Sequence, residues 1–61
     1  MKLKYVKNED IAKYLVYHGE YIITEIDITY NAYHRRDVYM VDGKGFLYLK
    51  DAKNYIENRL N

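Results

Sequence analysis

EYIITEIDITY, residues 20–30, is the stretch that decides the fold of this chain. Its residues alternate in character, which predicts one face that carries Ile22, Thr24, Ile26, Ile28 and Tyr30. The opposite face is expected to carry Glu25, Asp27 and Thr29. Because successive side chains of a strand point to opposite sides, the pattern predicts a strand with one side on a core and the other in water.

Further strands are predicted on both sides of this segment. KLKYVK, residues 2–7, is typical of a short edge strand blunted by lysine. Residues 31–36 are predicted to form a loop, and residues 37–41 a strand. In VDGKGF, Asp42-Gly43 favours a type I′ hairpin turn, after which residues 46–49 complete the last strand.

Two helices are predicted. In the first, residues 9–18, Asn8 is an N-cap candidate, and one helical face is formed by Ile11, Tyr14, Leu15 and His18. The alternative for this segment is a hairpin in which YLVY and EYII pair across His18-Gly19. The second helix is predicted over residues 49–60, and its inner stripe is Ala52, Tyr55, Ile56, Arg59 and Leu60.

These elements predict a single α+β domain over residues 1–61. Its architecture is a small antiparallel sheet of three to four strands with helices packed on one face, in the order β-α-β-β-β-α.

The composition restricts what such a domain can be. A chain of 61 residues buries a thin core, and the absence of cysteine removes disulfides and thiolate metal sites as stabilising elements. Aromatic packing remains, and so does self-association into a homodimer. The nine tyrosines suit half-buried sheet faces and interfaces alike. A formal net charge of +1 disfavours a dedicated nucleic-acid binder.

The residue types also disfavour catalysis. The chain has no serine or cysteine, so Thr24 and Thr29 are the only hydroxyl nucleophiles of that kind, with no histidine near them in sequence. The histidines, His18 and His34, have no partner at metal-ligand spacing. We therefore expect no enzyme activity, no metal and no cofactor. No apolar stretch is long enough to span a membrane, so we expect a cytoplasmic protein, in the host cell if it is viral.

The C-terminal half, DVYMVDGKGFLYLKDAKNYIENRL, resembles a pattern of small phage and prophage proteins: a hairpin ending in aromatic-x-x-Leu-x-x-Ala-Lys-x-x-Ile. It is also similar to the end of the arm-binding N-terminal domains of phage integrases. Gly45, Phe46, Asp51 and Ala52 match the strand-to-helix junction of those domains, whereas Tyr48 stands where they have a capping threonine. The resemblance covers about 25 residues and implies an architecture and a mobile-element origin.

The integrase-like resemblance also implies a way to bind DNA, in which the exposed sheet face enters the major groove. Carried over to this chain, it places four residues near DNA: Arg36, Tyr39, Lys44 and Tyr48. Glu25 and Asp27 oppose this role, because we expect them on the open face of the neighbouring strand, where they would repel phosphate.

The favoured interpretation is a non-enzymatic protein-binding module, of the kind that a phage-type accessory or modulator protein uses to occlude a host protein. The stretch YNAYHRRDVY, residues 30–39, combines the tyrosine and arginine anchors of interface hot spots. The predicted partner-binding residues are Tyr21, Tyr33, His34, Arg35, Arg36 and Tyr39. Alternatives are a β-sheet DNA-binding domain, a homodimer seam made by the tyrosines, and an ordinary solvated loop.

Overall fold

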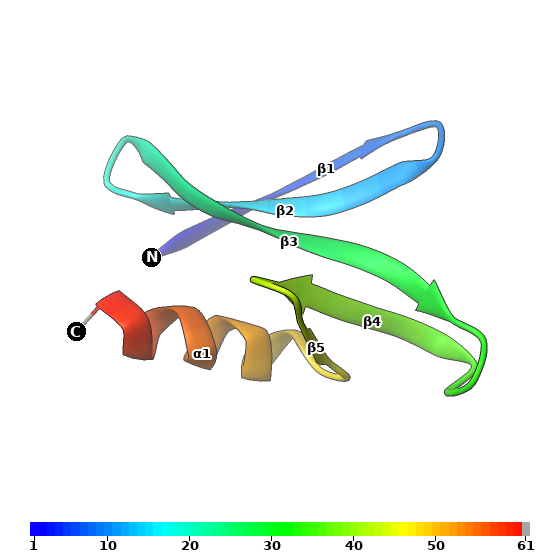
Figure 1. The fold of residues 1–61 in the computed structure, drawn as a ribbon. Helices are drawn as coiled ribbons and strands as arrows, with labels where there is room; N and C mark the ends of the chain where they lie inside the picture. Colours follow the sequence, from blue (N-terminus) through cyan, green and yellow to red (C-terminus); the bar gives the residue numbers. More distant parts are fainter. Residues whose placement is uncertain (61) are drawn as a thin grey trace.

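The computed structural model describes residues 1–60 and shows five strands followed by one C-terminal helix (Figure 1). The elements are β1 (Lys2–Asn8), β2 (Ile11–His18), β3 (Tyr21–Asn31), β4 (Arg36–Val41), β5 (Lys44–Phe46) and α1 (Leu49–Leu60). The strands form one antiparallel sheet in chain order. The predicted sheet of three to four strands with two helices is therefore wrong: the described chain is β-β-β-β-β-α.

Residues 9–18, predicted as a helix, form a tight turn and β2 instead. Asn8 pairs with Ile11, so the two residues between them close the β1–β2 hairpin. Asparagine and aspartate favour turns for the same reason that they favour helix N-caps, namely hydrogen bonds to the nearby backbone. Because β2 pairs with a strand on each side, its backbone groups find partners without a helix. Sheet pairing therefore overrides the local helical periodicity.

The hairpin alternative is right in that β2 and β3 form a hairpin, but its register is wrong, because Tyr14 and Leu15 pair with Ile26 and Glu25, beyond EYII. His18 pairs with Tyr21, so the turn residues are Gly19 and Glu20, one position later than the predicted His18-Gly19. Gly19 has a φ of 64°, in the left-handed region that glycine adopts without a Cβ clash. Glycine at the first central position is typical of a type II′ turn, whose twist matches that of the flanking strands.

A β-bulge interrupts β3 opposite the end of β2. Val16 pairs with Thr24, but the next pair joins Tyr17 to Ile22, so β3 carries one extra residue. The extra residue disrupts the alternation of faces, and Ile22 is 53% exposed. Its predicted place on the same face as Ile26 is therefore wrong, because Ile26 has no exposed surface and lies in the core.

The first half of β3 is also an unpaired sheet edge. β4 pairs only with residues 27–31 of β3, so residues 21–26 have β2 on one side and no strand on the other. The two outer strands are blunted: β1 carries three lysines, and β5 is three residues long. The β3 edge carries no lysine and exposes Ile22 and Ile23.

The predicted type I′ turn between β4 and β5 is confirmed. Asp42 and Gly43 have φ values of 51° and 77°, and both central residues of a type I′ turn require positive φ. Asp42 also forms an ion pair with Arg59 in the last turn of α1. The turn is thereby tied to the end of the helix.

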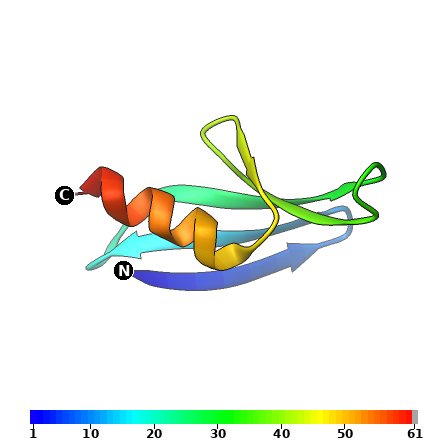
Figure 2. The ribbon, with the colours of Figure 1, turned by 90° about the horizontal axis from the view of Figure 1, so that it is seen from below.

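Helix α1 begins and ends where the sequence predicts, and it packs across one face of the sheet. At its start, the Tyr48 carbonyl accepts hydrogen bonds from the backbone N–H groups of Asp51 (3.1 Å) and Ala52 (3.4 Å). The core joins the helix to three strands and consists of Val16, Ile26, Val41, Ala52 and Ile56. Figure 2 shows that α1 covers only part of the sheet, so the ends of the β1–β2 and β3–β4 hairpins extend beyond it.

The opposite sheet face is open. Glu25, Asp27 and Thr29 lie on it and are exposed, as predicted. Lys13 pairs with Asp27 in the ladder and forms a 2.6 Å ion pair with Glu25. The hydrogen bond to the Glu25 carboxylate raises the pKa of the Lys13 ammonium, and the nearby charge of Asp27 adds to this effect. Among residues 1–60, no helix has the length and apolar character that a membrane crossing requires.

Candidate functional site

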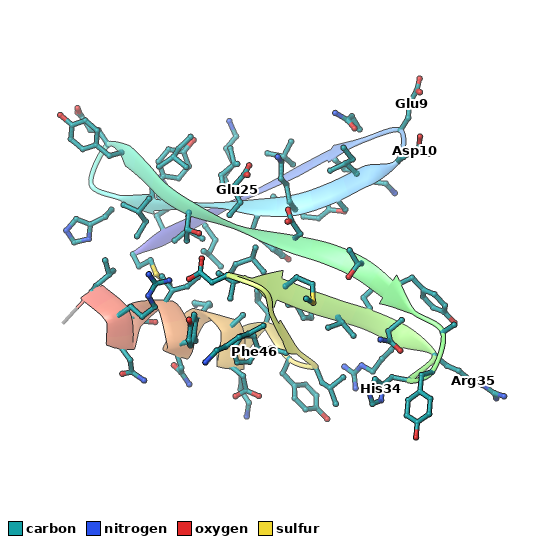
Figure 3. The ribbon with its side chains drawn as sticks, viewed as in Figure 1. Glu9, Asp10, Glu25, His34, Arg35 and Phe46 are labelled. Atoms are coloured by element: carbon teal, nitrogen blue, oxygen red, sulfur yellow. The ribbon has the colours of Figure 1, made fainter. Side chains whose placement is uncertain are left out.

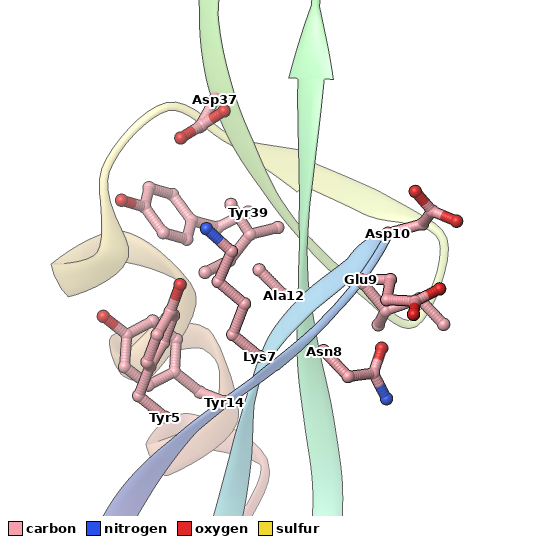
Figure 4. A pocket seen from close by; sticks show the side chains of 11 residues that line it. Tyr5, Lys7, Asn8, Glu9, Asp10, Ala12, Tyr14, Asp37 and Tyr39 are labelled. Carbon is pink, nitrogen blue, oxygen red and sulfur yellow. The ribbon is translucent and has the colours of Figure 1, made fainter.

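An open groove of about 540 Å³ lies on the helix-side face of the sheet, where α1 leaves the strands uncovered (Figure 4). It is lined by Tyr5, Lys7, Asn8, Glu9, Asp10, Ile11, Ala12, Tyr14, Ile28, Asp37 and Tyr39. These residues come from β1 to β4 and from the β1–β2 turn. The groove is therefore a product of sheet pairing, because no single segment of the chain supplies it.

One row of cross-strand neighbours crosses the groove, with Ala12 and Ile28 on its floor. Lys7 pairs with Ala12, Ala12 with Ile28, and Ile28 with Tyr39, so the four side chains lie side by side on the same face. Ala12 is the smallest of them. Its single methyl group leaves space between the larger neighbouring side chains, which gives the groove its depth.

Three tyrosines form the walls. Tyr5 and Tyr14 are cross-strand neighbours, with ring centroids 5.4 Å apart and ring planes inclined by 58°. Tyr39 stands beside Ile28 and packs partly against the core. All three come from the helix-side face, and each can present an aromatic surface and a hydroxyl group to a ligand.

Charged groups surround the aromatic walls. Glu9 and Asp10 lie at the tip of the β1–β2 turn, at the far end of that hairpin (Figure 3), and Asp37 is placed on β4. Lys7 reaches across the groove toward the ring of Tyr39 (Figure 4). The lining thus contains three carboxylates and one ammonium group.

The β3–β4 loop, which contains three of the six predicted contact residues, lies at the same end of the sheet as the β1–β2 turn (Figure 1). Tyr33 is 90% exposed at this loop, and its ring meets that of His34 edge-on at 5.1 Å. The backbone N–H of His34 donates to Asn31 Oδ1 at 3.0 Å, and Arg35 has a positive φ of 55°. Tyr33, His34 and Arg35 therefore share one short loop, in which Figure 3 labels His34 and Arg35.

Arg36 is engaged within the protein. Its guanidinium donates to the Leu47 carbonyl oxygen at 3.0 Å and lies 4.8 Å from the centroid of the Tyr48 ring. These contacts link the start of β4 to the segment between β5 and α1. Arg36 thus contributes to the fold at this point, and its guanidinium group is less available to a partner than that of Arg35.

Tyr21 and Tyr39 are separated from the loop. Tyr21 is 77% exposed, but it lies at the β2–β3 turn, at the opposite end of the eleven-residue strand β3. Tyr39 lines the groove in the middle of β4. The structure therefore divides the six predicted contact residues among the loop, the start of β4, the groove and the far end of the sheet.

The residues that the integrase-like resemblance assigns to DNA do not share the open sheet face. Tyr39 and Lys44 lie on the helix side, where the Lys44 ammonium is 5.0 Å from the centroid of the Tyr55 ring. Arg36 and Tyr48 contact each other near the start of α1. The open face carries the exposed carboxylates of Glu25 and Asp27.

Most of the groove is missed by sequence reasoning. With residues 9–18 taken as a helix, Tyr14 belongs to a helical stripe and Ala12 has no role. The alternative hairpin contains part of the missing signal, because it places Tyr14 and Val16 on one face, but it does not extend to Ala12. Only Tyr39 belongs both to the predicted contact residues and to the groove.

In the part of the chain that the structure describes, no three histidine, aspartate or glutamate side chains come close enough together to hold a metal ion. No protein-family model matches the sequence, and no curated protein and no solved structure is significantly similar to it.

Proposed function

We propose that this chain is a non-enzymatic protein-binding module whose contact surface is the tyrosine-walled groove and the adjacent β3–β4 loop. The observation that carries the proposal is that no residue of α1 lines the groove, in which the exposed ring of Tyr5 stands with the half-buried rings of Tyr14 and Tyr39. The setting that we propose is that of a small phage-type accessory protein that occludes a surface of a host protein.

The side-chain chemistry supports this role. Tyrosine buries a large area on binding at low entropic cost, and interface hot spots are enriched in it. The exposed rings of Tyr30 and Tyr33 extend the aromatic surface from the groove toward the loop. Tyr30 pairs with Asp37, a groove residue, so the two regions are contiguous on the helix-side face.

Affinity capture with purified, tagged protein tests the proposal when groove and loop variants are compared. Ala12→Phe fills the groove without removing a wall, and Tyr33→Ala removes the most exposed ring of the loop. Tyr21→Ala is the matched control, because Tyr21 is a similarly exposed tyrosine at the other end of the sheet. The complex with a captured partner is then reconstituted from purified components. We expect its binding to be lost with Ala12→Phe, weakened with Tyr33→Ala and retained with Tyr21→Ala.

Nuclease treatment separates the protein-binding role from the DNA-binding alternative. A partner that survives nuclease and depends on Ala12 supports the proposal. Capture that disappears with nuclease and falls steeply with salt indicates a nucleic-acid ligand instead. Equal capture by the wild type and Ala12→Phe, with both shown to be folded, removes the groove from the proposed surface.

A further inference from the structure

We propose that the groove binds a lysine or arginine side chain presented by an extended segment of the partner protein. The inference rests on the proposed function and states which kind of partner segment the groove accepts. It is drawn from the rings, the charges and the position of Lys7.

The rings favour a cation. The face of an aromatic ring is negative, and a cation that lies over it within about 6 Å is attracted to it. This chain uses the same contact three times elsewhere: Arg36 lies over Tyr48, and Lys44 and Arg59 lie over Tyr55. In the groove, Tyr5, Tyr14 and Tyr39 provide three rings from three strands.

The lining charge favours a cation as well. Glu9, Asp10 and Asp37 outnumber Lys7, the one basic residue of the lining. None of the three carboxylates takes part in an ion pair within residues 1–60, where the pairs formed are Lys13–Glu25 and Arg59–Asp42. They are therefore available to a basic group brought by a partner.

The position of the Lys7 ammonium indicates where the cation of a partner would lie in the groove. Its ammonium reaches over the floor toward Tyr39, it is exposed, and it forms no ion pair with any described residue. A partner cation that enters the groove competes with this ammonium. Removing the Lys7 charge should therefore strengthen binding, which is the opposite of what the loss of a direct contact would do.

The dimensions favour a segment of chain over a single side chain. A volume of about 540 Å³ exceeds that of one lysine or arginine, and the groove is open to solvent. Backbone on either side of the basic residue can therefore lie along the rings, where tyrosine hydroxyls can donate to its carbonyl groups. An extended, proline-flanked segment loses little entropy when it binds in this way.

The test is a titration of the ¹⁵N-labelled protein with the blocked pentapeptide Ac-Ala-Pro-Arg-Pro-Ala-NH₂, followed by NMR. Two matched peptides carry norleucine or glutamate in place of arginine. We expect the arginine peptide to shift groove resonances and to bind about tenfold more tightly than the norleucine peptide. The glutamate peptide should bind more weakly than both.

Three variants test whether the arginine peptide binds in the groove. Lys7→Met should tighten the binding of the arginine peptide, Asp37→Asn should weaken it, and Ala12→Phe should abolish it. Lys7 and Asp37 are exposed, so these two variants are expected to stay folded and to remain informative if Ala12→Phe does not fold.

Equal affinity for the arginine and norleucine peptides would overturn the inference, and so would weaker binding in Lys7→Met. If no peptide binds while Ala12→Phe still loses the captured partner, the inference fails and the proposed function stands. If no peptide binds and folded Ala12→Phe captures the partner normally, both fail.

Discussion

Tyr5 and Tyr14 face each other across the β1–β2 hairpin, with their ring centroids 5.4 Å apart. This contact attaches an edge strand to the sheet at the point where α1 no longer covers it. We predict that Tyr5→Ala lowers the free energy of unfolding by about 1 kcal/mol, the usual worth of a cross-strand aromatic pair. Denaturant unfolding measures the change. Tyr5→Phe keeps the ring and should remain close to the wild type, and a large loss in that variant would show that the hydroxyl is structural.

Ile26 should be the most sensitive position of the core. It has no exposed surface and contacts the cluster that joins the sheet to α1. Ile26→Ala should cost about 2–5 kcal/mol, and a domain of this size rarely has more than about 3–5 kcal/mol in total. We therefore expect the variant to be largely unfolded by circular dichroism, and Ile26→Val to fold with a lower melting temperature. The matched control is Ile22→Val, on the same strand but exposed, which should leave the melting temperature unchanged.

The turn at Asp42-Gly43 should tolerate only residues that accept a positive φ. Gly43 has a φ of 77°, which asparagine adopts more readily than any β-branched residue. Gly43→Val should therefore destabilise the fold by about 1–3 kcal/mol, and Gly43→Asn by clearly less. No heavy atom lies within 4 Å of a Cβ added at Gly43, so the difference reports backbone strain and not crowding. Equal unfolding midpoints for the two variants would argue against this account.

The unpaired edge of β3 should control aggregation. Residues 21–26 pair on one side only, and Ile22 is exposed there. Lysine on such an edge opposes pairing with another chain, so Ile22→Lys should slow aggregation on heating, as measured by light scattering, with little change in stability. The Ile22→Lys variant also tests for a homodimer at this edge. If the wild type dimerises through it, the melting temperature should rise with concentration in the wild type and not in Ile22→Lys.

The Lys13–Glu25 ion pair should add stability that is lost in alkaline solution. The pKa of Lys13 is raised in the folded protein above its ordinary value of 10.5. A raised pKa means that the folded state holds this proton more tightly. The contribution is therefore fully present below the ordinary pKa and disappears as the pH rises through the folded-state value. An NMR titration should show the pKa of Lys13 falling in Glu25→Gln, and an unchanged value would contradict the assigned cause.

The elements that formed as predicted have strong local signals. Asp42-Gly43 is a strong local signal for a type I′ turn, because both residues accept the positive φ values that this turn requires. Helix α1 has an apolar stripe containing Ala52 and Ile56, and no strand pattern competes with it. Strand β3 alternates in character over residues 24–30, and there its faces are as predicted.

Residues 9–18 were mispredicted because their local signals are ambiguous. Asn8 suits an N-cap and a turn equally well, and Ile11, Tyr14 and Leu15 recur at the spacing of a helical face. Both faces of β2 carry apolar side chains, since Val16 faces the helix and Leu15 the open side. The alternation that identifies a half-buried strand is therefore absent from it.

The sequence by itself determined the β3 strand, the β4–β5 turn, the C-terminal helix and the abundance of tyrosine. Only the tertiary structure decided that residues 11–18 are a strand and that Tyr5, Tyr14 and Tyr39 share one groove. The physical reason is that a helix is stabilised by contacts within a few residues, whereas a strand is stabilised by partners elsewhere in the chain. The groove depends on the register of four strands around Ala12, and that register exists only in the folded sheet.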